Sequence, residues 1–388
     1  MTSAFRLESK YKAFIIAVIT FGVAYGLEKA VIDNYLAEIV NMTQFDRGVS
    51  EFFRELPGVL LVFILAVLYE LSAESIFRAG ALIALLGMIL EATLPAQRAW
   101  ITFAVFVFSL GDHMMFGMRS TIALQYSREG HGGAALGIQN SAYEFGKLAG
   151  YIIVAIVFWI LGRKTNLFRP FFWTSAAIIA MGFIMSLNMT GQSRQDEHKR
   201  RFYFRRKYFK FYMLEVFYGA RKQIFFTFGP YLLVLFYKAS AMAISILFSL
   251  SAIACFICAP LVGKIIDRFG YKIVMVMDTL ILVIVCFFYG FAHHIFSMDT
   301  AFLICCVNYI LDAVISLASM ASNVYVQDIS DNADEVRATI STGVSVNHLI
   351  TILIALFGGW IWMTLGIETL FMLSAIFGLF NSAYAASI

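Results

Sequence analysis

Charged residues are scarce in this chain of 388 residues. Only 14% of the residues are charged, whereas soluble proteins have about 25%. Hydrophobic residues make up 61% of the chain, and Phe alone occurs 39 times. A soluble fold has no interior large enough to bury that much apolar surface, so the composition excludes an ordinary soluble domain and favours a lipid environment. With five prolines and no long polar stretch, the chain is not expected to be disordered.

Several motifs are absent from the sequence. It contains no G-x-x-x-x-G-K-[ST] phosphate-binding loop, which excludes an ATP-driven pump on this chain. The H-E-x-x-H and G-x-S-x-G patterns of hydrolases are also missing, so we predict that the protein is not an enzyme. The pair Cys255 and Cys258 has neither a second pair nor a nearby histidine to complete a metal site. We therefore expect no cofactor and no metal site. We also expect no removable signal peptide, because the first apolar run lacks a cleavage site.

Long apolar runs fill most of the chain. A membrane-spanning helix needs about 20 mostly apolar residues. Twelve such runs predict an all-α integral membrane protein with twelve transmembrane helices, approximately 12–34, 49–69, 75–95, 99–126, 133–161, 170–190, 208–236, 239–262, 271–292, 297–327, 337–363 and 365–386. One long polar connection divides the runs six and six. We predict an N-terminal six-helix bundle over 1–190, a basic cytoplasmic linker over 191–207 and a C-terminal six-helix bundle over 208–388.

Basic residues are concentrated on one predicted side of the membrane. The central connection carries Arg194, Lys199, Arg200, Arg201, Arg205, Arg206, Lys207 and Lys210. Positively charged loops stay in the cytoplasm, so we place this connection and both termini on the cytoplasmic side of a bacterial inner membrane. Contact of the basic run with anionic membrane lipid accounts for its charge, and we expect no nucleic-acid partner. We expect the protein to be a monomer.

An internal repeat supports the division into two halves. Tyr25-Gly26-Leu27-Glu28-Lys29 in the first run corresponds to Tyr218-Gly219-Ala220-Arg221-Lys222 in the seventh. Near the same offset, the loop Tyr69–Glu74 corresponds to the loop Gly263–Arg268. The two matches keep one register, which indicates a repeat of six helices.

The loop between the eighth and ninth runs carries a recognisable motif. It reads Gly-Lys-Ile-Ile-Asp-Arg-Phe-Gly-Tyr-Lys over 263–272. This resembles the G-x-x-x-D-R-x-G-[RK]-[RK] loop of the major facilitator superfamily, with Tyr271 where a basic residue is usual. In that family the loop acts as a latch that stabilises one transport state, which implies this role for Gly263, Asp267, Arg268 and Gly270. The copy in the first half departs from the pattern, with Tyr69 for the glycine and Ala73-Glu74 for Asp-Arg.

The latch residues have specific expected roles. Gly263 is expected to allow close helix packing, and Gly270 a tight turn. Asp267 is expected to lie at the N-terminus of a neighbouring helix and to interact with its dipole.

Ionisable residues within the predicted spans are expected to have a function, because placing each one at the bilayer centre costs about 2.5–3.5 kcal/mol. The family resemblance implies that the first, fourth, seventh and tenth helices line a central cavity, flanked by the second, fifth, eighth and eleventh. Most of the charges lie in these helices; Glu91 and Asp278 are exceptions near predicted helix ends. The candidate substrate-binding or proton-coupling residues are Tyr25, Glu28, Lys29, Asp112, His113, Tyr143, Glu144, Lys147, Tyr218, Arg221, Lys222, Asp312, Asn347 and His348.

Helical spacing refines this set but leaves alternatives open. Tyr218, Arg221 and Lys222 share one helix face. Glu144 and Lys147 either neutralise each other or take part in transport. Glu28 and Arg221 have the same register in the two halves, so they either pair with each other or interact directly with the substrate or a proton.

We therefore predict a secondary active transporter that works by alternating access, with proton coupling. The expected substrate is a small organic solute, and the basic residues favour an anionic or amphiphilic one. Two alternatives remain: a multidrug or metabolite efflux pump of the same fold, and a transporter-like membrane sensor that does not transport. The direction of transport is open.

Overall fold

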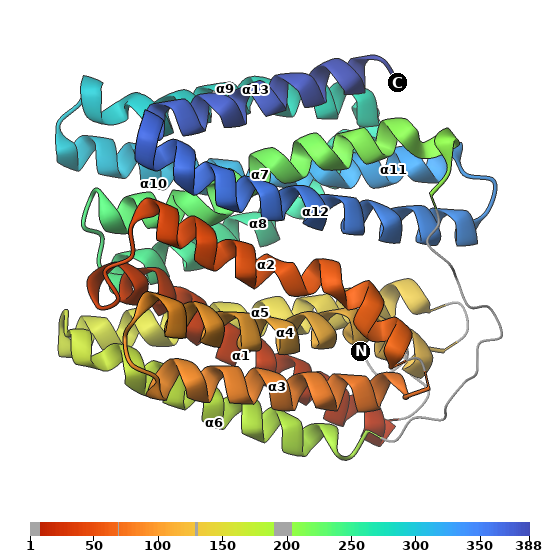
Figure 1. Ribbon diagram of the computed structural model, residues 1–388. Coiled ribbons are helices and arrows are strands. Elements are labelled where there is room, and N and C mark those ends of the chain that lie inside the picture. The colour runs from red at the N-terminus through yellow and green to blue at the C-terminus, as the bar shows by residue number, and fades with distance from the viewer. Residues whose placement is uncertain (1–7, 69, 129–130, 190–203) are drawn as a thin grey trace. The chain divides into compact units, whose positions relative to one another are not determined.

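The computed structural model describes residues 8–68, 70–128, 131–189 and 204–388. Its regular elements are helices, as predicted (Figure 1). Most of the predicted basic linker, including Arg194, Lys199, Arg200 and Arg201, lies outside the described residues.

The described residues form two compact units. Unit 1 contains the described residues of Met1–Asn41, Phe53–Glu197 and Ser240–Ser249, and unit 2 contains those of Met42–Phe52, His198–Ala239 and Leu250–Ile388. The helices of the first half are α1 (Glu8–Glu38), α2 (Gln44–Val67), α3 (Ala73–Thr93), α4 (Arg98–Tyr126), α5 (Gly132–Leu161) and α6 (Phe168–Ser186), with the short 3-10 helix η2 (Thr165–Leu167). In unit 1, α1 packs against both α5 and α6, and α3 packs against α4 and α6.

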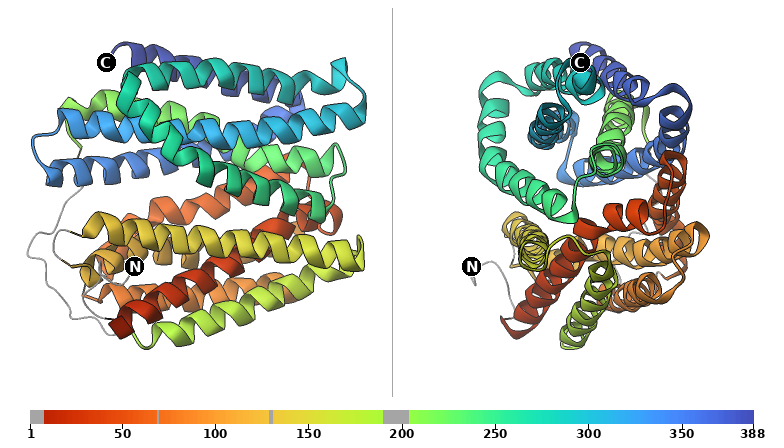
Figure 2. Two further views of the ribbon diagram at one scale, coloured as in Figure 1. Left: turned by 180° about the vertical axis from the view of Figure 1, so that it is seen from behind. Right: turned by 90° about the vertical axis from the view of Figure 1, so that its left-hand side faces the viewer.

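The second half begins with the 3-10 helix η3 (Arg206–Tyr208). It continues with α7 (Phe209–Leu235), α8 (Ala241–Phe269), α9 (Tyr271–Ile295), α10 (Met298–Ile315), η4 (Ser316–Ser319), α11 (Met320–Ile329), α12 (Ala333–Leu365) and α13 (Ile367–Ala386). In unit 2, α7 packs against α12 and α13, and α9 packs against α10 and α13. The end-on view in Figure 2 shows that the long helices within this unit run side by side.

Ten helical segments of the described residues are long and apolar enough to cross a membrane. Each of the twelve predicted runs overlaps a helix, and the tenth run corresponds to α10, η4 and α11 together. The helices α2 and α7 are not among the ten, because charged residues interrupt their apolar sequences, such as Arg54 in α2 and Arg221 in α7. The count of twelve spans therefore stays a prediction.

The distribution of polarity is that of a protein in lipid. Large apolar side chains such as Phe256, Trp159 and Phe63 are more than half exposed, whereas charged residues such as Glu91 and Arg221 are buried. Apolar side chains toward the solvent and charges inside fit a hydrocarbon environment. The protein is therefore an integral, multi-pass membrane protein.

Glycines allow α1 and α5 to approach closely. A Cβ atom added at Gly26 would lie 2.4 Å from the backbone oxygen of Lys147, and one added at Gly22 would lie 2.4 Å from that of Tyr143. Small residues at such contacts let the backbones of transmembrane helices touch. This close contact fixes where the side chains of the first helix lie relative to those of the fifth.

Candidate functional site

The first polar cluster of unit 1 lies on α1. The Lys29 Nζ atom lies 3.6 Å from Oδ2 of Asp33, one turn later on the same helix. Glu28 is only 6% exposed and makes no hydrogen bond or ion pair with the described residues. Lys29 and Arg54 interact with Glu28 through electrostatics alone. A buried carboxyl group that makes no hydrogen bond is costly to keep in an apolar interior, so Glu28 is a strong candidate for a functional role.

A cluster of aromatic rings and cations lies beside it on α1, α4 and α5. The rings of Tyr25 and Tyr143 have centroids 6.1 Å apart. The Arg119 guanidinium lies 3.7 Å from the Tyr143 ring centroid, and Lys147 Nζ lies 5.5 Å from the same centroid. The cluster thus holds two cations against an aromatic face, an arrangement that is attractive through the ring quadrupole.

The predicted pair of Glu144 and Lys147 forms, with 2.8 Å between Oε2 and Nζ. Glu144 is exposed in the described structure, and Lys147 is half-buried. The contact is the mutually neutralising arrangement that helical spacing allows.

His113 makes local contacts on α4, beside the half-buried Asp112. Its Nδ1 atom lies 2.9 Å from the backbone oxygen and 3.0 Å from Oγ of Ser109, one turn earlier. Ser109 Oγ in turn donates a hydrogen bond to the backbone oxygen of Arg54. These contacts tie the histidine to its own helix and, through Ser109, to α2.

The main charged cluster of unit 2 is centred on Arg221 of α7. Arg221 is 1% exposed, and its Nη2 atom lies 3.0 Å from Oδ2 of Asp278 on α9. Asp312 of α10 is buried and interacts electrostatically with both groups. Tyr218 packs its ring 5.2 Å from the Arg221 guanidinium, and Lys222 is exposed. Arg221 therefore has a counter-charge within its own unit, a partner that the sequence analysis did not consider.

Glu215 extends this cluster by one turn of α7. Its Oε1 atom accepts a hydrogen bond from Ser322 Oγ at 3.3 Å, and its Oε2 atom accepts one from Asn347 Nδ2 at 3.3 Å. The predicted residue Asn347 thus positions a carboxylate, and His348 follows it on α12, half-buried.

The predicted latch residues lie at the end of α8 and the start of α9. Gly270 has φ +81° and ψ 154°, a conformation that only glycine adopts readily, and α9 begins at the next residue. Asp267 and Arg268 are exposed in the last turn of α8. The expectation for Gly263 is wrong for the described residues, because a Cβ atom there would meet nothing within 4 Å. The helix face at this position is open, so the glycine is not required for packing.

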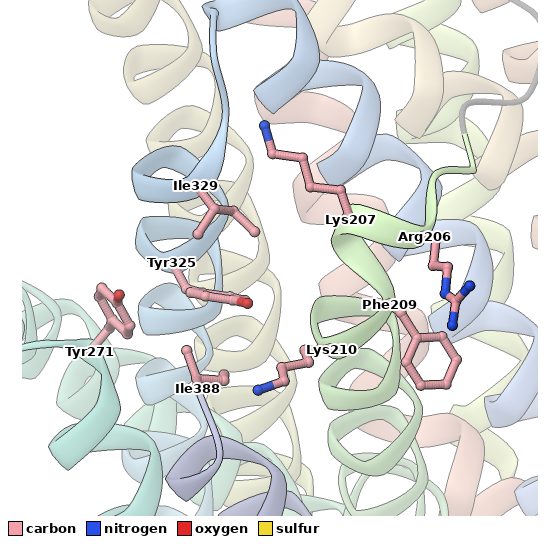
Figure 3. A pocket seen from close by; sticks show the side chains of 8 residues that line it. All are labelled: Arg206, Lys207, Phe209, Lys210, Tyr271, Tyr325, Ile329 and Ile388. Carbon is pink, nitrogen blue, oxygen red and sulfur yellow. The ribbon is translucent and has the colours of Figure 1, made fainter.

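A pocket of about 800 Å³ lies at one end of unit 2, away from the predicted substrate residues. Arg206, Lys207 and Lys210 line one part of it, and Figure 3 shows Lys210 pointing toward Ile388. The hydrogen bond from Lys207 to Asp331, at 2.9 Å, raises the pKa of the Lys207 ammonium above its usual value. None of the candidate substrate residues lines this pocket.

Several charged residues outside the predicted set also occupy buried or clustered positions, among them Asp278, Glu91 and Arg119. Asp278 and Glu91 were dismissed as lying near helix ends, yet Asp278 is the partner of Arg221, and Glu91 is completely buried with neither carboxylate oxygen hydrogen-bonded within the described structure. Arg119 contacts the predicted Tyr143. Its spacing from Asp112, two helical turns, was the available signal, because residues seven apart lie on one helix face.

Comparisons with known proteins agree with this architecture. The sequence matches the family described as Major Facilitator Superfamily over residues 13–345, with a second match over 211–387. A search of curated proteins gave no match. Similar solved structures include the nucleoside transporter NupG, with 14% identity, 98% of this chain and 99% of that chain covered and a TM-score of 0.77.

Two further solved structures are similar over nearly the whole chain. A D-xylose-proton symporter has 12% identity, 97% of this chain and 96% of that chain covered and a TM-score of 0.76. A POT family transporter in complex with 5-aminolevulinic acid has 11% identity, with 96% and 94% covered and a TM-score of 0.74. At these identities the similarity shows the fold.

Proposed function

The chain belongs to the Major Facilitator Superfamily of membrane transporters, and from this premise we propose that it is a secondary active transporter for a small organic solute with an anionic group. The observation that carries this proposal is the placement of basic residues next to aromatic rings in both halves of the chain. Lys147 and Arg119 face Tyr143 in unit 1, and Arg221 and Lys222 face Tyr218 in unit 2. Cations beside aromatic faces bind the charged and apolar parts of an amphiphilic anion.

Transport is proposed to follow alternating access by the two predicted six-helix halves, 1–190 and 208–388. The carboxyl groups of Glu28, Asp112, Glu144 and Asp312 are the proposed proton carriers. Glu28 supports this best, because it is buried and lacks an ion pair within the described residues. The D-xylose-proton symporter named above is coupled to protons, which supports this proposal.

A solute screen followed by a transport assay tests the proposal. Purified protein is heated with a panel of organic anions, cations and neutral solutes, and those that raise the melting temperature are assayed for uptake into proteoliposomes under an imposed pH gradient. We expect stabilisation by a subset of organic anions and uptake that a protonophore abolishes. Uptake that ignores the pH gradient would refute proton coupling, and binding without any uptake would favour a membrane sensor.

Lys147→Met and Lys164→Met form a matched pair for this assay. Lys147 contacts Tyr25 and Tyr143, whereas Lys164 is exposed between α5 and η2. We expect Lys147→Met to raise the apparent KM for the solute by at least about tenfold, the effect of losing one charge-assisted contact. Lys164→Met is expected to leave the KM unchanged, and equal KM values for both variants would remove Lys147 from the solute site.

We also propose that both termini face the cytoplasm of a bacterial inner membrane. Lys210 and Lys238 lie close to opposite ends of α7, so they report on opposite sides. In intact cells, an impermeant maleimide should label Lys238→Cys and spare Lys210→Cys, with the parent protein as the control for its native cysteines. The reverse pattern would invert the topology.

A further inference from the structure

A small cavity in unit 2 is lined by six oxygen-bearing side chains and by the apolar residues Leu214, Met275 and Ala318. Its volume is about 10 Å³, roughly the room that one water molecule or one ion of that size occupies. The polar residues that line it are Glu215, Tyr218, Asp278, Ser319, Ser322 and Asn381. They come from α7, η4, α9, α11 and α13, so the cavity lies where several helices of one unit meet.

One lining group, Asn381, offers an oxygen that is not used by any hydrogen bond in the described residues. Asn381 is 5% exposed, and its Oδ1 atom has no hydrogen-bond partner in the described part of the chain. A buried carbonyl oxygen without a donor costs about 1–3 kcal/mol. A bound cation in the cavity removes this cost, because an amide oxygen is a good ligand for a hard cation.

The tenth span is interrupted beside the same cavity. The 3-10 segment η4 separates α10 from α11, and the Tyr218 hydroxyl donates to the backbone oxygen of Ser316 at 3.1 Å. That bond uses the hydroxyl hydrogen, which leaves the lone pairs of the Tyr218 oxygen free to accept. Interrupted membrane helices supply ion ligands in transporters, because their backbone and side-chain oxygens line a cavity instead of facing lipid.

The charged side chains around the cavity have a net charge of −1, which one monovalent cation would neutralise. The carboxylates are Glu215, Asp278 and Asp312, and the cations that face them are Arg221 and Lys222. Counted as ionised, they have one excess negative charge. A single monovalent cation neutralises it, whereas Ca²⁺ takes more oxygen ligands, at least six, and adds a surplus charge.

We propose that this cavity is a sodium-binding site, with Glu215, Asp278 and Asn381 as its principal ligands and the hydroxyls of Ser319 and Ser322 completing the shell. Glu215 and Asp278 each keep acceptor capacity, since each carboxylate oxygen has two lone pairs and makes one observed contact. Sodium bound to Asp278 competes with Arg221 for the same carboxylate, and thereby links ion occupancy to the charged cluster of the proposed solute site. Only this link rests on the proposed function; the binding of sodium does not.

Sodium binding is measured on the purified full-length chain without any solute. The melting temperature is recorded while NaCl replaces choline chloride at constant ionic strength, with KCl as a second series, and ²²Na⁺ binding is measured by equilibrium dialysis. We expect saturable stabilisation by Na⁺, following ligand linkage, and none by choline. Equal stabilisation by NaCl and choline chloride, with no ²²Na⁺ bound, overturns the site and leaves the transport proposal untouched.

A matched pair of asparagine variants locates the ion. Asn381→Ala removes the unpartnered oxygen, whereas Asn308→Ala changes another buried asparagine of unit 2 whose side chain donates to Ile304. We expect at least about a tenfold loss of sodium affinity in Asn381→Ala and no change in Asn308→Ala. An unchanged affinity in Asn381→Ala refutes the assignment. If that variant does not fold, Glu215→Gln gives the same comparison.

Discussion

The two repeat segments of the chain carry buried side chains of opposite charge at the same repeat position. In unit 2 the repeat position is Arg221, which is buried and paired with Asp278 at 3.0 Å. In unit 1 the equivalent position is Glu28, which is buried and has no ion pair with the described residues. The neighbouring lysines also differ, since Lys29 is buried against Asp33 and Lys222 is exposed.

This difference distinguishes a buried charge that stabilises the fold from one that can exchange a proton or bind a ligand. A buried ion pair holds its members in place, and removing one member leaves the other uncompensated. A buried carboxyl without a partner gains a proton or a ligand cation more readily than a paired one exchanges its partner. The first half therefore offers the better candidate for proton movement, and the second half the more rigid cluster.

The largest expected effect comes from breaking the pair in unit 2. Arg221→Ala leaves Asp278 buried and uncompensated, which is expected to cost about 3–5 kcal/mol. The double variant Arg221→Ala/Asp278→Ala is expected to be more stable than the single one. Melting temperatures in detergent measure both, with Glu28→Ala as the comparison from unit 1, expected to destabilise less. Additive effects of the two changes in unit 2 would mean that Arg221 and Asp278 do not interact energetically.

Gly26 and Gly219, which precede these charges in the two repeat segments, also differ in how closely other helices pack against them. A Cβ atom at Gly26 would lie 2.4 Å from the backbone oxygen of Lys147, whereas one at Gly219 would lie 2.8 Å from the side chains of Asn347 and Ile350. Backbone cannot move aside as a side chain can, so Gly26→Ala is expected to cost about 1–3 kcal/mol. For Gly219→Ala the gain in helix propensity offsets part of the clash. Thermal unfolding of the two variants tests this order, and a more severe loss in Gly219→Ala would contradict it.

The aromatic contacts give a smaller difference. Arg119 lies 3.7 Å from the ring centroid of Tyr143, and Arg221 lies 5.2 Å from that of Tyr218. We expect Tyr143→Leu to destabilise by about 0.5–2 kcal/mol through the lost cation–π contact, and Tyr143→Phe to retain most of it. Thermal unfolding of both variants measures this, with Tyr218→Leu as the weaker counterpart in unit 2. A Tyr143→Phe variant as unstable as Tyr143→Leu would show that the ring contact is not the cause.

The smallest expected effect on stability concerns the loops of the two halves. Asp267→Asn removes a charge four residues before α9 begins, worth about 0.3–1 kcal/mol if it interacts with the helix dipole. We expect this variant to fold and to transport more slowly. The control is Glu74→Gln in the first turn of α3, at the corresponding place in the first half, where the sequence departs from the family motif. Wild-type transport rates in Asp267→Asn would end the latch hypothesis.

Sequence reasoning was most successful for the helices and least successful for the partners of the charges. The twelve apolar runs each overlap a helix because length and hydropathy are local properties. The pair of Glu144 and Lys147 was also predictable, since helical spacing alone brings it together. Asp278 was missed as the partner of Arg221 because no local pattern brings the seventh and ninth helices together.

The sequence by itself determined that this protein lies in a membrane and that it carries the loop motif of its family, because hydropathy and short motifs are properties of neighbouring residues. It also predicts a repeat of two six-helix halves. Only the tertiary structure decided which buried charges have partners. Helical periodicity shows on which face of a helix a side chain lies, but not which residues of other helices pack against it. The same holds for Asn381 at its small cavity and for Gly26 against the backbone of α5, where residues far apart in the chain meet through close packing.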